Sequence, residues 1–392
     1  MRVALCNVQE FNPLIGGIER VSVSLAEQLI DNNVEVVFIS CRKSKYSKEY
    51  CLPAPQFILP SSEDYSLENV AHMIKLVREQ KIDILINQNA HSYSFHKQCC
   101  EVSRQSDVKL ISVLHFDPDM RRKGYKNMMC DRFFTIREKI KNGMYSFLLS
   151  YPLTYISLRD QRKLYRALYY DSDRTVLLSS KYYEIFSKIG GISEHDKLSA
   201  IANMLSFPIE KNEYCKSNTI LFCGRMAPQK NPYRALYAWR ILQKVLPDWN
   251  IKFVGDGPWF ERLKLMAEKL GLCRYEFCGM QSPINYYKEA KIFLLTSNYE
   301  GFPLVLNEAM QYGCVPVAFE SFESITDIIS NGENGFLVTP FDINQFADKI
   351  KELAMNCCEF DRMSKNARQS TDRFAPEKII KKWQDLFYKV LR

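Results

Sequence analysis

Short apolar runs alternate with amphipathic segments along most of the chain. In the first half this pattern predicts strands at 2–7, 34–40, 82–87, 109–114, 175–179 and 198–202, with helices in most gaps, notably 17–31 and 66–79. In the second half it predicts strands at 219–223, 251–255, 275–278, 292–296 and 315–319, alternating with helices at 232–245, 258–270, 284–290 and 303–312. Alternating strands and helices are typical of doubly wound parallel sheets. We therefore predict an α/β protein with two Rossmann-like domains.

Chain length supports two domains. The chain has 392 residues, of which 46% are hydrophobic. A chain of this length exceeds the size that a single hydrophobic core usually accommodates. The polar stretch 208–218 is the expected linker, so we predict an N-terminal domain at 1–207 and a C-terminal domain at 208–375. The last segment, 376–392, is predicted to be a helix with one apolar stripe, formed by Ile379, Ile380, Trp383, Phe387 and Val390.

Two carboxylates flank a predicted strand-to-helix turn in the second half. The charge-free run 292–297 is expected to be a buried strand, Pro303 suits the first helical position, and Gly313 suits the end of the helix. Glu300 then lies in the loop and Glu308 in the second helical turn. The amides and dipole of a helix start bind phosphate, and carboxylates accept hydrogen bonds from hydroxyls. The pattern therefore indicates a site for a phosphorylated sugar.

Two cations follow another predicted strand. Arg225 lies in the turn after strand 219–223, and Lys230 lies beside the next helix start. Arginine binds phosphate oxygens in a bidentate manner, and lysine acts as a point charge. Both side chains are suited to neutralising a departing diphosphate.

The first half carries weaker signals. Gly16 and Gly17 follow the first strand, where they either admit an anion close to the backbone or simply form a turn. His115 ends the strand 109–114 and is expected at the carboxyl edge of the sheet. His91 and His96 follow another strand and are alternatives for the same role.

The segment 300–308 resembles the glutamate-pair signature of the retaining glycosyltransferases of family four, which have the two-domain GT-B fold. Residues 220–231 resemble the strand, Gly-Arg turn and Lys-Asn helix entry of that family, and 253–258 resemble its next strand and Gly turn. The resemblance covers about 218–375. In the first half it rests on three shorter matches, at 16–20, at His115 and at 177–180.

The resemblance implies transfer of a hexose or N-acetylhexosamine from a nucleoside diphosphate sugar, UDP-linked, to a surface glycan, with retention and on a lipid-linked acceptor. It implies that Glu300 binds the donor sugar, that Glu308 binds the ribose diol, and that the final helix crosses back to the N-terminal domain. The implied catalytic residues are Glu300, His115, Arg225 and Lys230. The implied donor-binding residues also include Gly16, Gly17, Gly224, Gly301, Phe302, Pro303, Leu304, Val305 and Glu308.

Other activities fit less well. A GT-B epimerase or phosphorylase is the alternative enzyme, and a noncatalytic nucleotide-sugar binder is the alternative outside enzymes. The complete set of Glu300, Glu308, Arg225 and Lys230 argues against the binder. The Gly255-Asp256-Gly257 turn lacks the third glycine of a dinucleotide fingerprint, which argues against a dehydrogenase.

We expect neither a cofactor nor a metal. Two D-x-D sequences, at 117–119 and 171–173, resemble the metal motif of another glycosyltransferase fold, but neither lies in the half that we expect to bind phosphates. With two cations and a helix dipole available, we interpret both as turn or helix-cap aspartates.

The net charge of +8 is concentrated in one segment. Residues 121–141 hold eight basic side chains, and the uncharged stretch 142–158 follows them, so that 118–158 forms a basic and apolar insertion. This composition favours docking at an anionic membrane surface through Arg121, Arg122, Lys123 and Lys126. The alternative is a solvated helical insertion whose apolar side packs on its own domain. No nucleic-acid-binding module accompanies the patch, so we expect no nucleic-acid partner.

Cysteine usage and hydropathy point to the cell interior. The 13 cysteines show no C-x-x-C pair, which favours free thiols in a reducing compartment. The start of the chain is expected to be a strand with too short an apolar core for a secretory signal. No stretch is long and apolar enough to be a transmembrane span. We expect a cytoplasmic protein, peripheral at the inner face of the cell membrane.

Overall fold

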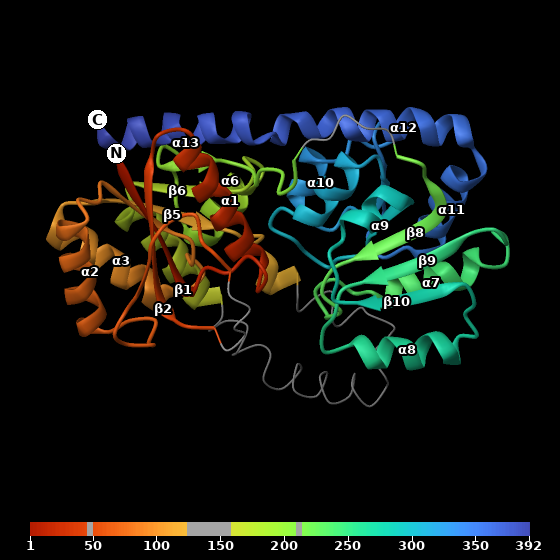
Figure 1. Cartoon of the computed structure of the whole chain (residues 1–392), viewed down its shortest axis with the longest axis horizontal. Coiled ribbons are helices and arrows are strands. Elements are labelled where there is room, and N and C mark those ends of the chain that lie inside the picture. The colour runs from red at the N-terminus through yellow and green to blue at the C-terminus, as the bar shows by residue number, and fades with distance from the viewer. Residues whose placement is uncertain (45–49, 124–157, 209–213) are drawn as a thin grey trace. The chain divides into compact units, whose positions relative to one another are not determined.

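The computed structural model describes residues 1–44, 50–123, 158–208 and 214–392 (Figure 1). The described residues form two compact units. The first contains 1–119, 158–206 and 374–392, and the second contains 120–123, 207–208 and 214–373. No helix in the described ranges combines the length and the apolar character needed to cross a lipid bilayer.

The first unit contains a seven-stranded parallel sheet with the order β3-β2-β1-β4-β5-β6-β7. Its strands are β1 (Arg2–Gln9), β2 (Glu35–Arg42), β3 (Gln56–Ile58), β4 (Ile84–Asn87), β5 (Lys109–Leu114), β6 (Arg174–Leu177) and β7 (Leu198–Ala200). The helices around it are α1 (Gly17–Asp31), α2 (Leu67–Glu79), α3 (Tyr93–Ser106), the helical residues 158–171, α6 (Tyr182–Gly190) and α13 (Pro376–Leu391).

Both faces of this sheet are buried, which explains the continuous apolar runs of β1 and β2. Val3 and Leu5 of β1 pack with α1 and α13, whereas Ala4 and Cys6 pack with α2 and α3. The apolar stripe of α13, with Trp383 at its middle, therefore completes the core of the first unit rather than that of the second.

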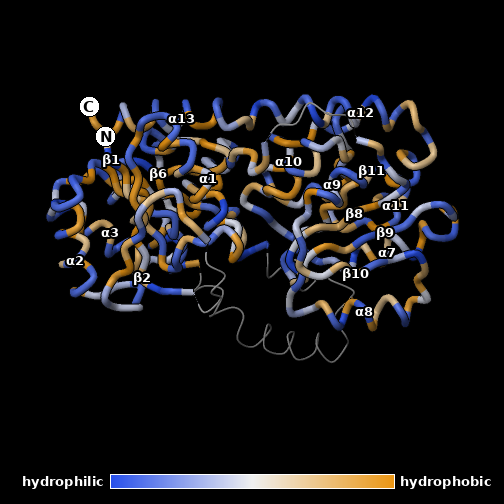
Figure 2. Tube along the Cα trace, in the orientation of Figure 1, coloured by the Kyte–Doolittle hydropathy of each residue, from blue (hydrophilic) through white to orange (hydrophobic). Residues whose placement is uncertain are grey.

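The second unit contains a six-stranded parallel sheet with the order β10-β9-β8-β11-β12-β13. Its strands are β8 (Ser217–Cys223), β9 (Asn250–Val254), β10 (Tyr275–Gly279), β11 (Ala290–Leu295), β12 (Val315–Phe319) and β13 (Phe336–Val338). Its α-helices are α7 (Tyr233–Leu242), α8 (Phe260–Lys269), α9 (Ile284–Glu289), α10 (Leu304–Gln311), α11 (Ile343–Met355) and α12 (Cys357–Ser370). The strands in the middle of each sheet are mostly hydrophobic in Figure 2.

The strand order reverses once in each sheet. In the first unit the reversal lies between β1 and β4, and in the second it lies between β8 and β11. Crevices at the carboxyl ends of the two strands beside such a reversal are the usual ligand sites of open parallel sheets. The loops that follow β1 and β4, and those that follow β8 and β11, are therefore where functional side chains are expected.

The doubly wound α/β fold predicted from the hydrophobic pattern is confirmed. The pattern missed β3 and β13, two strands of three residues at sheet edges, although it predicted β7, which has the same length and also lies at an edge. The helix predicted at 303–312 begins one residue later, so Pro303 is the residue before the helix rather than its first. Gly313 does end it, with a φ of 81° in the left-handed region.

Candidate active site

Glu300 is held by three side chains in the loop after β11. Its Oε1 accepts hydrogen bonds from Lys230 Nζ at 2.5 Å and from Ser297 Oγ at 2.6 Å. Its Oε2 accepts one from Gln229 Nε2 at 3.3 Å. The residue is 6% exposed, so the carboxylate is kept in one orientation and its charge is balanced by the ammonium group.

Lys230 reaches Glu300 because residues of the loop after β11 donate hydrogen bonds to backbone carbonyls of the loop after β8. Thr296 Oγ1 donates to the carbonyl of Lys230 at 2.8 Å, and Asn298 Nδ2 donates to the carbonyl of Pro228 at 2.8 Å. The amide of Asn298 also donates to the carbonyl of Gln229 at 2.8 Å. The predicted proximity of the two segments is thus produced by hydrogen bonds from residues that follow β11 directly.

Arg225 lies on the same loop after β8, but its side chain is exposed and has no ion pair or hydrogen bond within the ranges that the structure describes. The backbone below it is fixed. Gly255 has a φ of 125°, and a Cβ added there would lie 2.2 Å from the carbonyl oxygen of Gly224. Gly255 therefore permits a close backbone contact that holds the loop of Arg225 in place.

Glu308 lies in α10 and is completely buried. Its Oε2 accepts a hydrogen bond from Tyr287 Oη at 3.1 Å, and this hydroxyl also lies 3.6 Å from Cys223 Sγ at the end of β8. Phe302 is buried as well, and Ser324 Oγ donates to the carbonyl of Gly301 at 2.8 Å. The turn between the two glutamates is therefore anchored to the rest of the second unit.

His115 follows β5 directly in the first unit. Its Nε2 lies 2.6 Å from Oε1 of Gln88, which follows β4. Burial, with a smaller contribution from the charge of His91, lowers the pKa of His115 to about 3. The imidazole is therefore neutral at physiological pH. Nε2 of Gln88 is buried and has no hydrogen-bond partner in the described part of the chain, although buried donors are normally paired.

Of the two alternative histidines, His91 stacks edge to face on Phe116, with ring centroids 4.9 Å apart. His96 lies inside α3 among Cys100 and Ser112, away from the loops that follow the strands. His115 is therefore the histidine whose position matches the prediction.

Gly16 is the residue before α1, and Gly17 is the first residue of that helix. A Cβ at Gly16 would lie 2.3 Å from Oε2 of Glu19, whereas a Cβ at Gly17 would meet nothing within 4 Å. Glu19 is buried and accepts a hydrogen bond from Asn7 Nδ2 at 3.2 Å. Burial raises the pKa of Glu19. Because Gly16 has no side chain, it leaves room for the carboxyl group of Glu19.

The D-x-D carboxylates have local partners. Asp117 Oδ1 accepts from the amide of Asp119 at 2.8 Å, which is a turn contact. Asp173 Oδ2 accepts from the amide of Leu110 at 2.8 Å, and Asp171 Oδ1 accepts from Arg104 Nη2 at 2.8 Å. The interpretation as a turn aspartate fits Asp117, but the contacts of Asp173 and Asp171 reach residues 63 and 67 positions away and are neither turn nor helix-cap contacts.

Most of the predicted basic and apolar insertion, including Lys126, lies outside the described residues. Of its basic residues, Arg121, Arg122 and Lys123 are described. Lys123 forms an ion pair with Glu323. The side chain of Lys123 is only 16% exposed, so little of it is accessible to a membrane surface, and docking of the segment at a membrane stays a prediction.

Sequence reasoning missed five polar residues that support these groups, namely Gln88, Gln229, Ser297, Tyr287 and Glu19. Ser297 stands three residues before Glu300, and Glu19 stands at the third position of a helix, where an acidic side chain is favourable. These two carry a signal in the sequence. Gln88, Gln229 and Tyr287 carry none, because their partners are far away along the chain.

Two family models match the chain. The model described as "Glycosyl transferases group 1" matches residues 206–370, and the one described as "Glycosyltransferase Family 4" matches 15–205. Together they cover residues 15–370, which include every strand of the two sheets except β1. The chain belongs to the family-four glycosyltransferases. Its first half, where the motifs are short, matches the family over almost its whole length.

Relatives of this chain include an uncharacterized glycosyltransferase of Haemophilus influenzae, 32% identical over 182 residues, 45% of this chain and 52% of the relative. A second is the GalNAc-alpha-(1->4)-GalNAc-alpha-(1->3)-diNAcBac-PP-undecaprenol alpha-1,4-N-acetyl-D-galactosaminyltransferase of Campylobacter jejuni, 30% identical over 246 residues, 60% of this chain and 66% of the relative. The chain thus spans about half to two thirds of their lengths.

Among solved structures, Anabaena HepE in complex with UDP matches this chain with a TM-score of 0.74. The match covers 99% of this chain and 100% of HepE at 17% identity. An identity this low establishes the fold alone, and that fold is GT-B.

Proposed function

We propose that the protein transfers a hexose or N-acetylhexosamine from a UDP-sugar to a surface glycan, with retention of the anomeric configuration. The observation that carries this proposal is the ion pair of Lys230 with the buried Glu300, together with the buried Glu308 in the second turn of α10. These groups supply a cation for a diphosphate and oriented carboxylates for hydroxyls, which are the two requirements on the donor side of the reaction.

Each residue has a distinct task in this proposal. Lys230 and Arg225 neutralise the diphosphate as the bond to the sugar breaks. Glu300, kept in place by Ser297 and Gln229, accepts hydrogen bonds from the sugar hydroxyls. Glu308 accepts them from the ribose diol. No metal is needed in this scheme, because the two cations and the dipole of α10 supply the positive charge.

The first unit supplies neutral groups. His115 has an uncharged imidazole, and Gln88 has a buried amide nitrogen that is available to a ligand. We assign both to the donor sugar or the acceptor hydroxyl. The backbone at Gly16 and Gly17 approaches the diphosphate in this scheme, because Gly17 has open space around its Cα.

The acceptor is proposed to be a lipid-linked surface glycan, and the protein to act in the cytoplasm at the inner face of the membrane. The Campylobacter relative, which is named for a glycan on undecaprenol diphosphate, supports this choice. With Lys123 paired to Glu323, the described contribution to a basic docking surface is limited to Arg121 and Arg122. Sedimentation with anionic vesicles at low salt, lost at high salt, is the expected result. Absence of sedimentation at low salt would favour an acceptor in solution.

A panel of nucleotide sugars tests the proposal. The full chain is incubated with UDP-linked hexoses and N-acetylhexosamines and an undecaprenol-linked glycan acceptor, with and without EDTA. The expected result is transfer from one UDP-sugar, unaffected by EDTA, with a product whose anomeric configuration by NMR matches that of the donor. Epimerised donor, release of free sugar phosphate, or binding without turnover would each identify a different activity and overturn the proposal.

A further inference from the structure

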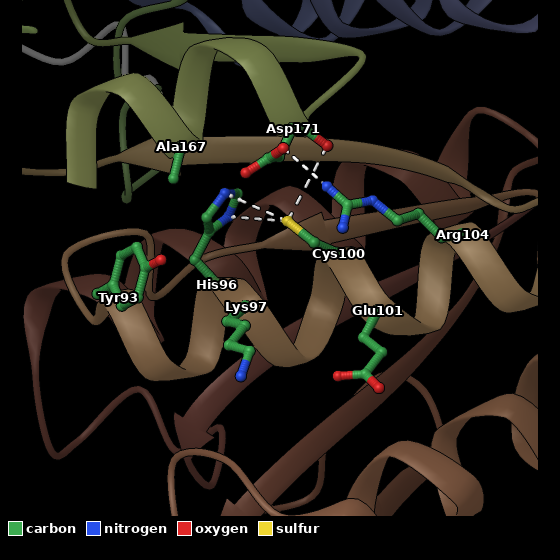
Figure 3. Close-up of a pocket in the computed structure, with 8 residues that line it drawn as sticks. All are labelled: Tyr93, His96, Lys97, Cys100, Glu101, Arg104, Ala167 and Asp171. Atoms are coloured by element: carbon green, nitrogen blue, oxygen red, sulfur yellow. Dashed lines mark hydrogen bonds and ion pairs between the residues drawn. The ribbon is translucent and has the colours of Figure 1, made fainter. Parts of the chain in front are cut away.

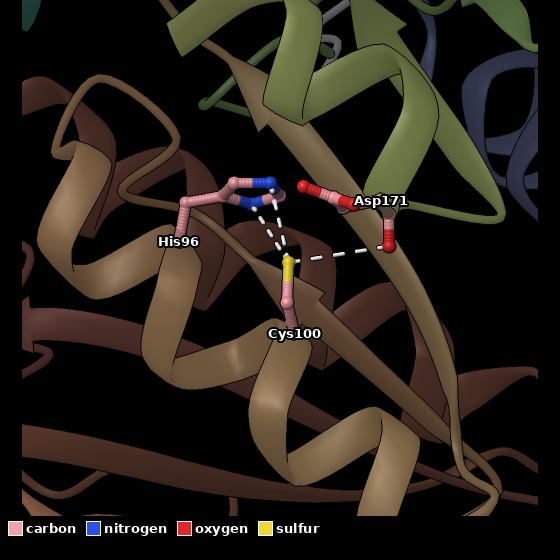
Figure 4. A group of neighbouring side chains, drawn as sticks. All are labelled: His96, Cys100 and Asp171. Atoms are coloured by element: carbon pink, nitrogen blue, oxygen red, sulfur yellow. Dashed lines mark hydrogen bonds between the residues drawn. The ribbon is translucent and has the colours of Figure 1, made fainter. Parts of the chain in front are cut away.

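Three side chains of metal-ligand type converge in the first unit, away from the loops that follow the strands. His96 and Cys100 project from α3, one helical turn apart, and Asp171 comes from the last residue of the helix at 158–171 (Figures 3 and 4). One ligand atom from each lies within 4.8 Å of the other two. Residues four apart on a helix share a face, so the first two ligands are placed by α3 alone.

The spacing of the first two ligands suits a tetrahedral cation. Cys100 Sγ lies 3.3 Å from His96 Nε2. Around zinc, with bond lengths of about 2.3 Å to sulfur and about 2.0 Å to nitrogen, tetrahedral angles place these two atoms roughly 3.5 Å apart. Asp171 is the adjustable third ligand, because it stands at the surface end of its helix, where a side-chain rotation brings an oxygen closer.

Outer contacts orient the ligands. His96 Nδ1 lies 3.3 Å from Ser112 Oγ, and that hydroxyl accepts a hydrogen bond from Ser172 Oγ at 2.9 Å. Arg104 Nη2 donates a hydrogen bond to Oδ1 of Asp171, so this bond does not occupy the other carboxylate oxygen, Oδ2. A histidine ligand whose second nitrogen has a fixed partner, and a carboxylate ligand held by one oxygen, are the usual supports of protein metal sites.

A cavity gives access to the cluster. It has a volume of about 330 Å³ and is lined by the three ligand residues together with Tyr93, Lys97 and Ala167, among others (Figure 3). The cavity admits a hydrated ion and leaves room for water as a fourth ligand.

We propose that His96, Cys100 and Asp171 bind one divalent cation of the zinc class, which ties α3 to the helix at 158–171. On binding, the thiol of Cys100 releases its proton to solvent. The thiolate, Nε2 of His96 and one carboxylate oxygen of Asp171 then coordinate the ion, and water takes the fourth position. Sulfur and nitrogen ligands favour zinc over magnesium or calcium. The role is structural and separate from the transfer reaction, which needs no metal in the scheme above.

Cobalt(II) is the probe, because its thiolate complexes absorb light. The full chain is stripped with a chelator and titrated with Co²⁺. Wild type is expected to develop a thiolate-to-cobalt absorption that saturates at one equivalent and is displaced by Zn²⁺. Cys100→Ala should abolish this absorption. Cys99→Ala is the matched control, since Cys99 is a neighbouring buried thiol on the side of α3 that faces the core, and it should retain the absorption.

Stability gives a second readout. One equivalent of Zn²⁺ is expected to raise the melting temperature of wild type and of Cys99→Ala, but not that of Cys100→Ala. Asp171→Asn should weaken cobalt binding by at least ~10-fold while the absorption persists, because the thiolate remains. The proposal is wrong if wild type develops no such absorption, if Cys100→Ala keeps it, or if Zn²⁺ stabilises wild type and Cys100→Ala equally.

Discussion

In the second unit, the loops after β8 and β11 are joined by a charged pair, Lys230 with Glu300, whereas in the first unit the loops after β4 and β5 are joined by a neutral pair, Gln88 with His115. Both pairs lie at the carboxyl ends of parallel strands, so the fold alone does not produce the difference. The residues at the strand ends produce it. Charged groups suit a diphosphate, and neutral donors and acceptors suit hydroxyls.

The largest expected effect tests the charged pair. Lys230→Ala removes the cation assigned to the diphosphate and leaves Glu300 without its counter-charge. We expect transfer to fall by about 100-fold, or about 3 kcal/mol. Arg225→Ala is expected to act in the same direction. Lys264→Ala is the control, because Lys264 is a surface lysine on α8 that pairs with Glu261 and lies over the ring of Phe260 on the same helix, and its activity should match wild type. Full activity of Lys230→Ala would remove the assignment.

The two glutamates of the second unit should fail in different ways. Glu308→Gln is expected to weaken UDP binding by about 10-fold or more, since hydrogen bonds to charged groups contribute about 1.5–3 kcal/mol. Glu300→Gln should leave UDP affinity unchanged and reduce transfer, because its proposed partner is the sugar. Calorimetry with UDP measures the first effect, and turnover measures the second. Equal losses of UDP affinity would show that the carboxylates have been wrongly assigned.

The neutral character of His115 is tested by pH. Its pKa is about 3 in the folded protein, against an ordinary value of about 6.5. Between these values the unfolded chain binds a proton that the folded protein excludes, so stability should fall as pH drops below about 6.5. For one histidine, the free energy of unfolding changes with pH by at most about 1.4 kcal/mol per pH unit.

The measurement is urea unfolding of wild type and His115→Gln between pH 7 and pH 5. The variant should lose stability less steeply with falling pH, whatever its absolute stability. The same slope in both proteins would mean that His115 is protonated in the folded state, and the contrast between a charged and a neutral pair would not hold.

The smallest effect concerns Tyr287, whose hydroxyl donates to Glu308. Tyr287→Phe removes one hydrogen bond and should cost about 1 kcal/mol, which is roughly a fivefold loss of UDP affinity, with KM for the donor raised and kcat nearly unchanged. Tyr286→Phe is the matched control, because that hydroxyl donates to Gln281 at the surface and should leave donor affinity as in wild type. A drop in kcat alone would assign Tyr287 another role.

Secondary-structure elements were predictable where the sequence carries local signals for them. The charge-free run before Glu300, Pro303 and Gly313 are local signals of strand, turn and helix. They located the strand before Glu300 within two residues and the helix after it within one. Strands β3 and β13 were missed, whereas β7, which is equally short, was predicted.

The sequence by itself determined the two parallel sheets and the segments that carry Lys230, Glu300 and Glu308, because each depends on a pattern within about a dozen residues. Only the tertiary structure decided which side chains meet. Gln229 lies beside Glu300 and Tyr287 beside Glu308 because sheet pairing brings distant loops to one edge. The cluster of His96, Cys100 and Asp171 needs α3 and a helix more than 50 residues away to pack together, and no local pattern specifies that contact.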